Sequence, residues 1–517
     1  RVVYSLSNIS CSQRLTSRCS ISHHLSDMEI LYYLSIALPA LLCLLYYYFT
    51  RTFNYWKSRG VVGPKPVPFF GNLKDQVLRK KVTNVVFKEI YDEYPNEKVV
   101  GIYRMTTPAL LIRDLDLVKH VMIKDFDMFD DRGIKFSKEG LGANLFHSDG
   151  DTWRVLRNRF TPLFTTGKLK NMLYLMMERG DSLIDYIGDI VDKTPEQEVV
   201  NLMQKYTMTT IAACAFGLDV DTINDTVETL KKIDKLVLSS TATLLAFELD
   251  MLYPEIFKKL NRDLFPRFVK VFFDDLVRNV IRERNGRNAD DEQLTLDITD
   301  DVIAAQAFVF YMSGYETSAT TSSFLLYEMA KNPDIQDKLI AEIDEVLHRH
   351  NGKFTYEAMT ELTYLDRAIT ETLRLYPIVS PLQRNAKEDY EVPGTEVTVK
   401  KGQTVVISAF GIHHDEKYYP NPTVFDPERW TAENSKDRHS CAYLPFGLGP
   451  RNCIGKDILY LQLIIKKGVK VTALKVKFFS NFQVEFSKKS KNVMDFEPKR
   501  FLLGPKGGIY LNIIKRK

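Results

Sequence analysis

The sequence predicts a mostly α-helical chain with small β-sheets (an α+β fold), built as one large domain behind one N-terminal transmembrane helix. Apolar residues recur at helical spacing from Thr83 to Leu375. Thr106–Ile112 and Glu391–Ile407 instead show the alternation and β-branching of strands, with a turn at Lys401–Gly402. The membrane helix is predicted from Ile30–Phe49, a run without charge. No internal repeat or long low-complexity linker follows, which favours one large body.

Composition excludes several classes of protein. Of the 517 residues, 45% are hydrophobic and 26% charged, the balance of an ordinary folded protein and not of a disordered tail, a collagen-like repeat or a polytopic transporter. The 70 basic and 66 acidic residues leave a net charge of only +4, so we expect no nucleic-acid partner. The six cysteines match neither a disulfide framework nor a zinc site in their spacing.

Residues 1–27 are rich in Ser, Arg and Cys, lack apolar periodicity and precede the first methionine, Met28. We interpret them as an upstream or artefactual extension. An organelle presequence is the alternative, because such segments are also rich in Arg and Ser and poor in acidic residues.

Residues 28–50 are predicted to be an N-terminal membrane anchor. About twenty helical residues span ~30 Å, the hydrocarbon thickness of a bilayer. Tyr46–Tyr48, Tyr55 and Trp56 are expected to form an aromatic belt, and the basic residues from Arg51 onward place the bulk of the chain on the cytoplasmic side. A cleaved signal peptide is the alternative, although the run is long and no small-residue cleavage site follows. Residues 51–68, basic and proline-rich, are expected to be a stiff linker to a catalytic domain over 69–517.

One helix is unusual. Apolar positions continue from Asp300, its expected cap, to Lys331, and Pro333 ends the pattern. Its centre, Ser313–Ser318, contains a glycine, which costs about 1 kcal/mol relative to alanine, and hydroxyl side chains that can bend the helix. A weakened polar centre in a long apolar helix indicates a binding position. A tolerated glycine and a surface glutamate are the alternative.

Phe446–Gly455 is the segment that indicates chemistry. Its glycines permit a tight turn, and Arg451 places a permanent positive charge near Cys453. Because an apolar run resumes after Gly455, Cys453 is predicted at a helix N-terminus, where free N–H groups stabilise a thiolate. A thiolate held in this way can be the axial ligand of haem iron. A small core cysteine is the alternative.

From Met28 to nearly its end, the sequence resembles microsomal cytochrome P450 enzymes. The Cys453 segment matches the haem-ligand loop of that family, and Ser313–Thr317 matches its oxygen-groove pattern, with Ser in place of Ala or Gly. Segments 144–170 and 498–508 resemble the insect xenobiotic-metabolising members. The resemblance implies haem b as the cofactor, with Cys453 as the metal ligand.

Further site residues are implied only by the resemblance. Glu371 and Arg374 match the ExxR pair, and Pro427–Trp430 matches the PERF motif with Trp in place of Phe, so Arg429 is expected to complete a structural triad. Haem contacts are expected from Arg132, Trp153, Arg157, Gly314, Arg384, Phe446, Gly449 and Arg451. Substrate contacts are expected from Phe136, Val309, Met312, Ser313, Ile378 and Val379.

The implied activity is a monooxygenase reaction that inserts one atom of O2 into lipophilic substrates, such as plant toxins, insecticides or endogenous lipids. Thr317 is expected to supply the hydroxyl, and Glu316 the acid, of a proton relay beside Gly314. Electrons are expected from NADPH through NADPH-cytochrome P450 reductase, with cytochrome b5 as a second donor. Arg154 and Lys456 are candidate docking residues. The expected location is the endoplasmic reticulum membrane, with the catalytic domain in the cytosol.

Two alternative functions stay open: a haem-thiolate isomerase or dehydratase, which Thr317 and Glu316 disfavour, and a catalytically impaired haem binder. The second alternative arises after Gly455. There the family continues with Arg-Phe-Ala, whereas this chain reads Lys456–Tyr460 followed by a Lys- and Val-rich run, which a sequence error or an insertion would explain. If the departure is genuine, we expect weak haem retention.

Overall fold

The chain divides into two units, Arg1–Arg51 and Thr52–Lys517, which are described separately. The computed structural model describes residues 27–134, 140–164, 166–217, 228–238, 240, 242–243, 246, 265–285, 299–353, 355–455 and 473–516. Phe136 and Lys456–Tyr460, which the sequence singled out, lie outside these residues.

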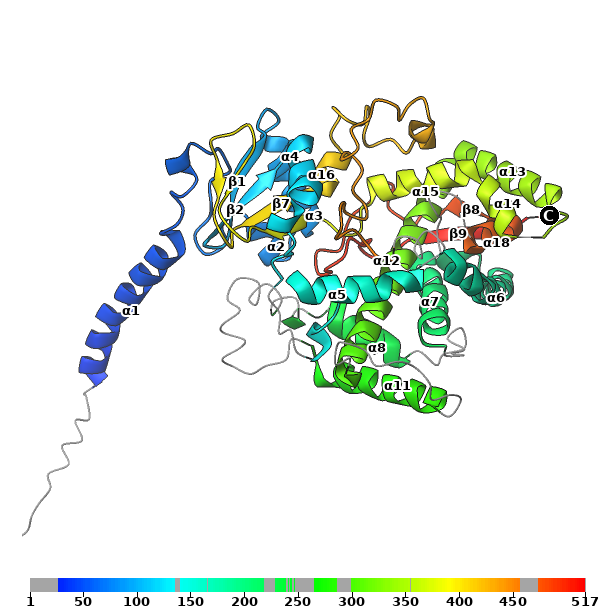
Figure 1. Ribbon diagram of the computed structural model, residues 1–517, viewed down its shortest axis with the longest axis horizontal. Coiled ribbons are helices and arrows are strands. Elements are labelled where there is room, and N and C mark those ends of the chain that lie inside the picture. Colours follow the sequence, from blue (N-terminus) through cyan, green and yellow to red (C-terminus); the bar gives the residue numbers. More distant parts are fainter. Residues whose placement is uncertain are drawn as a thin grey trace, which may run out of the picture. The chain divides into compact units, whose positions relative to one another are not determined.

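Helix α1 (Asp27–Thr50) is the described helix of the first unit (Figure 1). Its residues Leu31–Thr50 are long and apolar enough to cross a membrane, and their side chains are exposed over most of this length. No other helix among the described residues meets that test. The helix is consistent with the predicted membrane anchor.

The predicted linker 51–68 packs against the second unit from its second residue onward. The Thr52 hydroxyl donates to the carbonyl of Thr106 at 2.6 Å. Trp56 was predicted at the membrane interface, and that prediction is wrong, because its side chain is only 2% exposed and its indole N–H donates to the carbonyl of Ile102 at 3.0 Å. Much of this stretch is therefore part of the folded body.

A four-stranded sheet lies at one side of the second unit, with helices α3 (Thr83–Glu93), α4 (Leu115–Lys119) and α16 (Ala409–His413) beside it (Figure 1). Antiparallel strands β1 and β2 are followed by β7, parallel to β2, and by β4, antiparallel to β7. The strands are β1 (Val99–Arg104), β2 (Thr107–Ile112), β7 (Thr404–Ile407) and β4 (Leu382–Asn385).

The sheet both confirms and corrects the predicted strands. Strand β2 lies within predicted Thr106–Ile112, and Gly402 occupies the predicted turn with φ of +76°. Strand β1 was missed, since it falls in the stretch predicted to be helical. All six of its residues are buried, so it lacks the polar alternation that identifies a half-exposed strand.

Helices form most of the second unit. The helices not yet named are α2 (Lys74–Val77), α5 (Gly150–Phe160), α6 (Thr166–Val191), α7 (Val199–Ile211), α8 (Glu228–Leu238), α11 (Arg267–Asn285), α12 (Asp300–Lys331), α13 (Pro333–Arg349), α14 (Tyr356–Glu361), α15 (Thr363–Leu375) and α18 (Ala473–Asn481). The remaining strands form a sheet of β3 (Glu196–Glu198), β9 (Tyr510–Lys515) and β8 (Phe482–Phe486), and a pair of β5 (Tyr390–Glu391) and β6 (Thr398–Val399).

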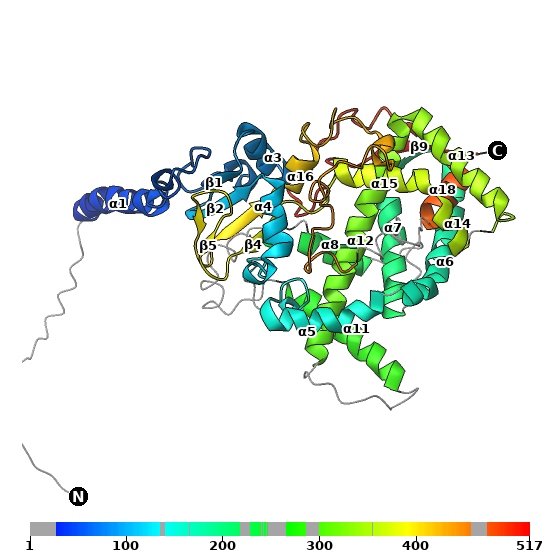
Figure 2. The same cartoon turned by 45° about the horizontal axis from the view of Figure 1, so that its top comes forward.

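Helix α12 runs through the helical part and contacts α7, α11, α15 and β8 (Figure 2). Its bounds are those predicted, but its N-cap is Thr299, whose hydroxyl accepts from the backbone N–H of Val302. Most of its residues from Ala304 to Ala330 are buried, because it is surrounded by other elements. A helix that is apolar on nearly all sides is expected to lie in a core.

Candidate active site

The loop that carries Cys453 is held by two tight backbone constraints. Gly449 has φ of +70°, and a Cβ there would lie 1.8 Å from the carbonyl oxygen of Met122, so no other residue fits. The Cys453 N–H donates to the carbonyl of Phe446 at 2.9 Å and closes the loop, while the Cys453 residue itself is exposed. The helix predicted after Gly455 lies outside the described residues.

Four arginines from separate parts of the chain gather beside Cys453, and we call them the arginine cluster: Arg132, Arg157 of α5, Arg384 of β4 and Arg451. Arg132 donates to the carbonyl of Arg451 at 3.0 Å. Arg157 donates to the backbone and side-chain oxygens of Asn452, both at 2.8 Å. Burial lowers the pKa of Arg132 and of Arg157, and a negative charge on the nearby Cys453 sulfur would oppose both shifts.

The cluster is rich in positive charge and poor in direct counter-charge. Within the described part of the chain, none of its members forms an ion pair with a carboxylate; their hydrogen bonds go to backbone carbonyls and to Asn452. Burial, followed by repulsion from Arg451, lowers the pKa of Arg384 to about 9. Burial also lowers the pKa of Arg451 to about 10, although Asp131 and Asp130 partly oppose the shift. Such a site favours an anion.

Two buried nitrogen atoms in the cluster have no hydrogen-bond acceptor, the Nε atoms of Arg384 and Arg451. A buried donor left unpaired costs about 1–3 kcal/mol. The guanidinium of Arg451 also lies over the ring of Trp153, 4.8 Å from its centroid. The structure thus brings together five predicted haem contacts, and its unpaired donors fit the carboxylates that haem would bring.

The Trp153 side chain connects the arginine cluster to α12. Its side chain packs with Phe126, Leu145 and Leu156 in a small apolar cluster, against which Ile454 and Phe310 also pack. Ile454 follows Cys453 in the chain, and Phe310 belongs to α12. The cysteine loop and the long helix therefore share one apolar contact region.

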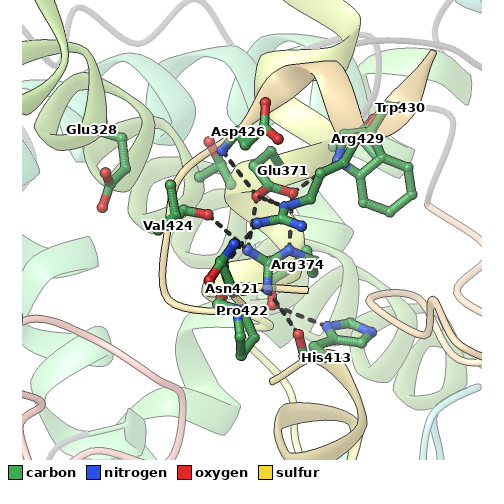
Figure 3. A network of polar contacts seen from close by, with 12 residues as sticks. Glu328, Glu371, Arg374, His413, Asn421, Pro422, Val424, Asp426, Arg429 and Trp430 are labelled. Atoms are coloured by element: carbon green, nitrogen blue, oxygen red, sulfur yellow. Dashed lines mark hydrogen bonds and ion pairs between the residues drawn. The ribbon is translucent and has the colours of Figure 1, made fainter. Parts of the chain in front are cut away.

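Glu371 lies at the centre of a buried polar network (Figure 3). Its carboxylate accepts from Arg374 at 2.7 and 2.9 Å, from Arg429 at 3.2 Å and from the indole N–H of Trp430 at 2.9 Å. Arg374 also donates to the carbonyls of His413 and Pro422, at 2.8 and 2.7 Å. This network ties α15 to the segment that carries η7 (Pro427–Trp430). Trp430, which replaces the Phe of the motif, adds a hydrogen bond that Phe lacks.

His413 and His414 raise the question of a metal site. His413 is fully buried, with Nδ1 at 3.1 Å from the carbonyl oxygen of Arg374 and Nε2 accepting from the N–H of Leu444 at 2.8 Å. Both ring nitrogens are thus used by the backbone. Among the described residues, no group of three or more His, Cys, Asp or Glu side chains could hold a metal ion.

The centre of α12 has two different faces. Ser313 is exposed and Thr317 half-buried, and the Thr317 hydroxyl donates to the carbonyl of Ser313 at 2.6 Å. Gly314 faces α7, since a Cβ there would lie 2.6 Å from Cδ1 of Ile211. The glycine therefore permits close packing of two helices, in addition to any role beside a cofactor.

Glu316 faces away from Thr317 and is buried in a charged network. Its carboxylate accepts from Arg500 at 2.6 Å, from Gln204 at 2.8 Å and from Thr320 at 3.2 Å. Asp234 lies 3.9 Å from Arg500. Burial and the charge of Glu316 raise the pKa of Asp234 to about 6. In this conformation the Glu316 carboxylate does not share a hydrogen bond with Thr317.

The expected substrate residues differ in exposure. Val309 and Met312 on α12 are 9% and 7% exposed, and Ile378 is 5% exposed, with its carbonyl accepting from Leu503 at 3.0 Å. Val379 is 37% exposed. Phe136 lies outside the described residues. Among the described members of the set, Ser313 and Val379 are the exposed positions.

Comparison with known proteins decides the family. A family model described as Cytochrome P450 matches residues 61–512. The chain belongs to the cytochrome P450 family. It is 54% identical to Cytochrome P450 6B1 of Papilio polyxenes over 94% of this chain and 100% of the relative. It is 51% identical to Cytochrome P450 6B2 of Helicoverpa armigera, over 94% and 99%, and 37% identical to Cytochrome P450 6j1 of Blattella germanica, over 91% and 95%.

Membership confirms the predicted family and fold class and makes the protein a cytochrome P450 monooxygenase. The family implies haem, and the positive charge of the arginine cluster fits the carboxylates of that cofactor. The departure predicted after Gly455 lies outside the described residues.

Several site residues were not found from the sequence. Gln306 and Arg500 each make hydrogen bonds that attach another segment to α12, and Asn452 binds Arg157. An isolated glutamine in the apolar run of α12 was a usable signal for Gln306. The sequence held no such signal for Arg500, because its partner Glu316 is 184 residues away in the sequence.

Proposed function

We propose that this P450 is a haem-thiolate monooxygenase in which Cys453 ligates the iron and the arginine cluster binds the propionates. The observation that carries the proposal is the cluster itself, because four guanidinium groups without paired carboxylates, two of them with unpaired Nε atoms, suit an anionic ligand next to an exposed cysteine. A thiolate at Cys453 is favoured by the same positive charges.

Haem, when bound, supplies the activation of O2 from which one atom is transferred to the substrate. Thr317 supports this chemistry through its hydroxyl oxygen. Because the hydroxyl donates its only hydrogen to the carbonyl of Ser313, its two lone pairs stay available to accept from a water molecule on the exposed face. Thr317 would thus hold the water through which protons reach the oxygen.

Glu316 is proposed as the acid of this relay, and Arg500 is the group that it would have to leave first. The ion pair with Arg500 holds the carboxylate in the core, whereas Thr317 lies on the other face of the helix. Rotation of the Glu316 side chain would be required to connect the two residues.

Electrons are proposed to come from NADPH through NADPH-cytochrome P450 reductase, with cytochrome b5 as a second donor, since P450 enzymes work with redox partners. Arg154 is a less available docking charge than expected, because it pairs with Asp127 at 2.8 Å and with Asp130 at 3.4 Å. Lys456 lies outside the described residues.

Lipophilic substrates are proposed because the expected contact residues are mainly apolar. Xenobiotics such as plant toxins or insecticides and endogenous lipids are the substrate classes. The apolar helix α1, followed by Arg51, Lys57 and Arg59, supports an anchor in the endoplasmic reticulum membrane with the catalytic domain in the cytosol.

The test is the difference spectrum of the reduced, haem-loaded protein with carbon monoxide. The wild type should show the shifted Soret band of a thiolate ligand, and Cys453→Ser should lose it. Cys214→Ala is the matched control and should keep the band, because burial raises the pKa of Cys214 to about 12 and leaves that thiol neutral. A well-folded wild type without the band would overturn the proposal. NADPH-dependent turnover with added reductase then distinguishes a monooxygenase from an isomerase.

A further inference from the structure

Gln306 attaches one loop segment to α12. Its side-chain oxygen accepts from the N–H of Leu145 at 2.9 Å, and its side-chain nitrogen donates to the carbonyl of Ala143 at 2.9 Å. The same nitrogen lies 3.3 Å from the carbonyl of Val302 in its own helix. The Gln306 side chain is buried, with 2% exposure, so these bonds are shielded from water. A single amide therefore satisfies two backbone groups of the segment 140–148.

The other end of segment 140–148 binds the arginine cluster. The carbonyl of Phe146 accepts from Arg132 at 3.0 Å, and the carbonyl of Ser148 accepts from Arg451. The guanidinium of Arg132 also lies 4.5 Å from the centroid of the Phe146 ring. Within the segment, the Asn144 side-chain oxygen accepts from the N–H groups of Phe146 and His147, at 3.0 and 3.1 Å, and so closes the turn. The segment thus connects Gln306 to two cations of the cluster.

Gln306 also lies in line with the exposed positions of α12. It precedes Ser313 by two helical turns and Thr317 by about three, so all three residues fall within ~20° of one line along the helix. The rise between Gln306 and Ser313 is ~10 Å. Segment 140–148 is therefore fixed at the N-terminal end of the face that carries Ser313 and Thr317.

We propose that Gln306 is a positioning residue for this P450: by holding segment 140–148 on α12, it sets both the substrate-side wall near Ser313 and the carbonyls that orient Arg132 and Arg451. The inference rests on the proposed haem-thiolate function. The neutral side chain of Gln306 would then couple the substrate side of the site to its propionate side.

The chain offers a matched control in Gln336. This buried glutamine makes the same two kinds of bond to one residue of β8: its oxygen accepts from the N–H of Val484 at 2.8 Å, and its nitrogen donates to the carbonyl of Val484 at 3.0 Å. It is 5% exposed and lies on α13. Gln306→Met and Gln336→Met each remove two buried bonds to the backbone of another segment, so both should lower the thermal midpoint, but only the first touches segment 140–148.

The experiment uses full-length, haem-loaded protein and three readouts. The rate of haem transfer to an excess of a haem-accepting apoprotein should rise by about tenfold in Gln306→Met relative to Gln336→Met, as expected when a group that orients cofactor contacts is lost. The spectral Kd of n-octylamine, a lipophilic iron ligand, should rise by a similar factor. The Kd of imidazole, which is too small to touch the wall, should stay within twofold. Gln306→Glu, which keeps the acceptor for Leu145, should fall between wild type and Gln306→Met.

Equal haem-transfer rates and equal n-octylamine Kd values in the two methionine variants would overturn the inference, because the role of Gln306 would then be only that of a structural glutamine. If Gln306→Met does not fold, the haem-transfer rate and the n-octylamine Kd of Gln306→Glu are compared with those of Gln336→Met instead. Failure of the proposed function is separate, since it would appear as a missing thiolate spectrum in the wild type.

Discussion

The half-buried Arg500 and the buried Glu316 form an ion pair, with 2.6 Å between Nη2 and Oε1, that joins the C-terminal region to the middle of α12. Residues beside Arg500 extend this connection: the N–H of Phe501 lies 3.4 Å from the carbonyl of Leu238, and Leu503 donates to Ile378. The segment 500–503 therefore links the helix that carries Thr317, through Arg500, with the segment that carries Ile378 and Val379, through Leu503.

Arg500→Met should strongly destabilise the protein, because the buried Glu316 and the half-buried Asp234 would be left without their cation. Breaking a buried ion pair from one side costs about 3–5 kcal/mol. The double variant Arg500→Met/Glu316→Gln should recover part of that loss. Thermal unfolding of the full-length protein measures both effects. Arg349→Met, which breaks the exposed pair with Glu361, is the control and should change the midpoint little. Additive losses in the double variant would contradict this account.

Lys475→Met should stabilise the protein, most strongly at and below neutral pH. Burial lowers the pKa of Lys475 to about 7, and among the described residues its Nζ has two hydrogen-bond partners, Met203 Sδ at 3.5 Å and the carbonyl of Ser322 at 3.4 Å. Because the folded-state pKa is depressed, the unfolded chain binds the proton more readily between about pH 7 and 10, and wild-type stability rises with pH there.

The gain from Lys475→Met should therefore be greatest below about pH 7 and should fade towards pH 10, as measured by thermal midpoints across this range. Lys477→Met, two residues further along α18, removes a lysine that pairs with Asp181 and should not raise the midpoint. A gain from Lys475→Met that is the same at every pH would show that packing, and not charge, explains it.

Thr317→Ala should uncouple the consumption of NADPH from product formation, since the hydroxyl proposed to hold water on the exposed face is lost. The ratio of product to NADPH, measured with added reductase, should fall several-fold. Thr321→Ala is the control one turn along: its hydroxyl also bonds a carbonyl four residues back, that of Thr317 at 2.8 Å, but its side chain is buried. An unchanged ratio in Thr317→Ala would remove the residue from the relay.

Arg384→Met should lower the stability of the haem-loaded protein but not that of the apoprotein. In the apoprotein, removal of one cation relieves repulsion from Arg451 and removes an unpaired buried Nε, so the thermal midpoint should rise or stay constant. In the haem-loaded protein, a propionate would lose a counter-ion, which is worth about 1.5–3 kcal/mol for a charged hydrogen bond. A fall of equal size in both forms would argue against anion binding at this position.

Patterns among neighbouring residues predicted those helices and strands whose formation depends mainly on neighbouring residues. The bounds of α12 followed from a continuous apolar run that ends before Pro333. Strand β1 was missed because its complete burial removes alternation, and Trp56 was misplaced because an aromatic residue after an anchor suits either an interface or a core. Motifs indicated the members of the arginine cluster, but not that they form no ion pair with the carboxylates that the structure describes.

The residues missed in the site make contacts across long stretches of sequence. Gln306 and Leu145 are 161 residues apart, and nothing near either residue specifies the other. For Glu316, the sequence predicted a carboxylate near Thr317 but not Arg500, which turns that carboxylate into the core. Such pairings depend on tertiary packing, which a single sequence does not reveal.

The arginine cluster has a consequence for the amount of the protein in the cell. A newly made chain that folds before haem binds must hold the four positive charges of the arginine cluster close together. Haem, as a ligand that binds only the native state, would then stabilise that state by mass action. Proteases and chaperones act on the unfolded fraction, so small differences in stability change abundance several-fold. The amount of this P450 in a cell should therefore follow the rate of porphyrin synthesis as well as the rate of its own translation.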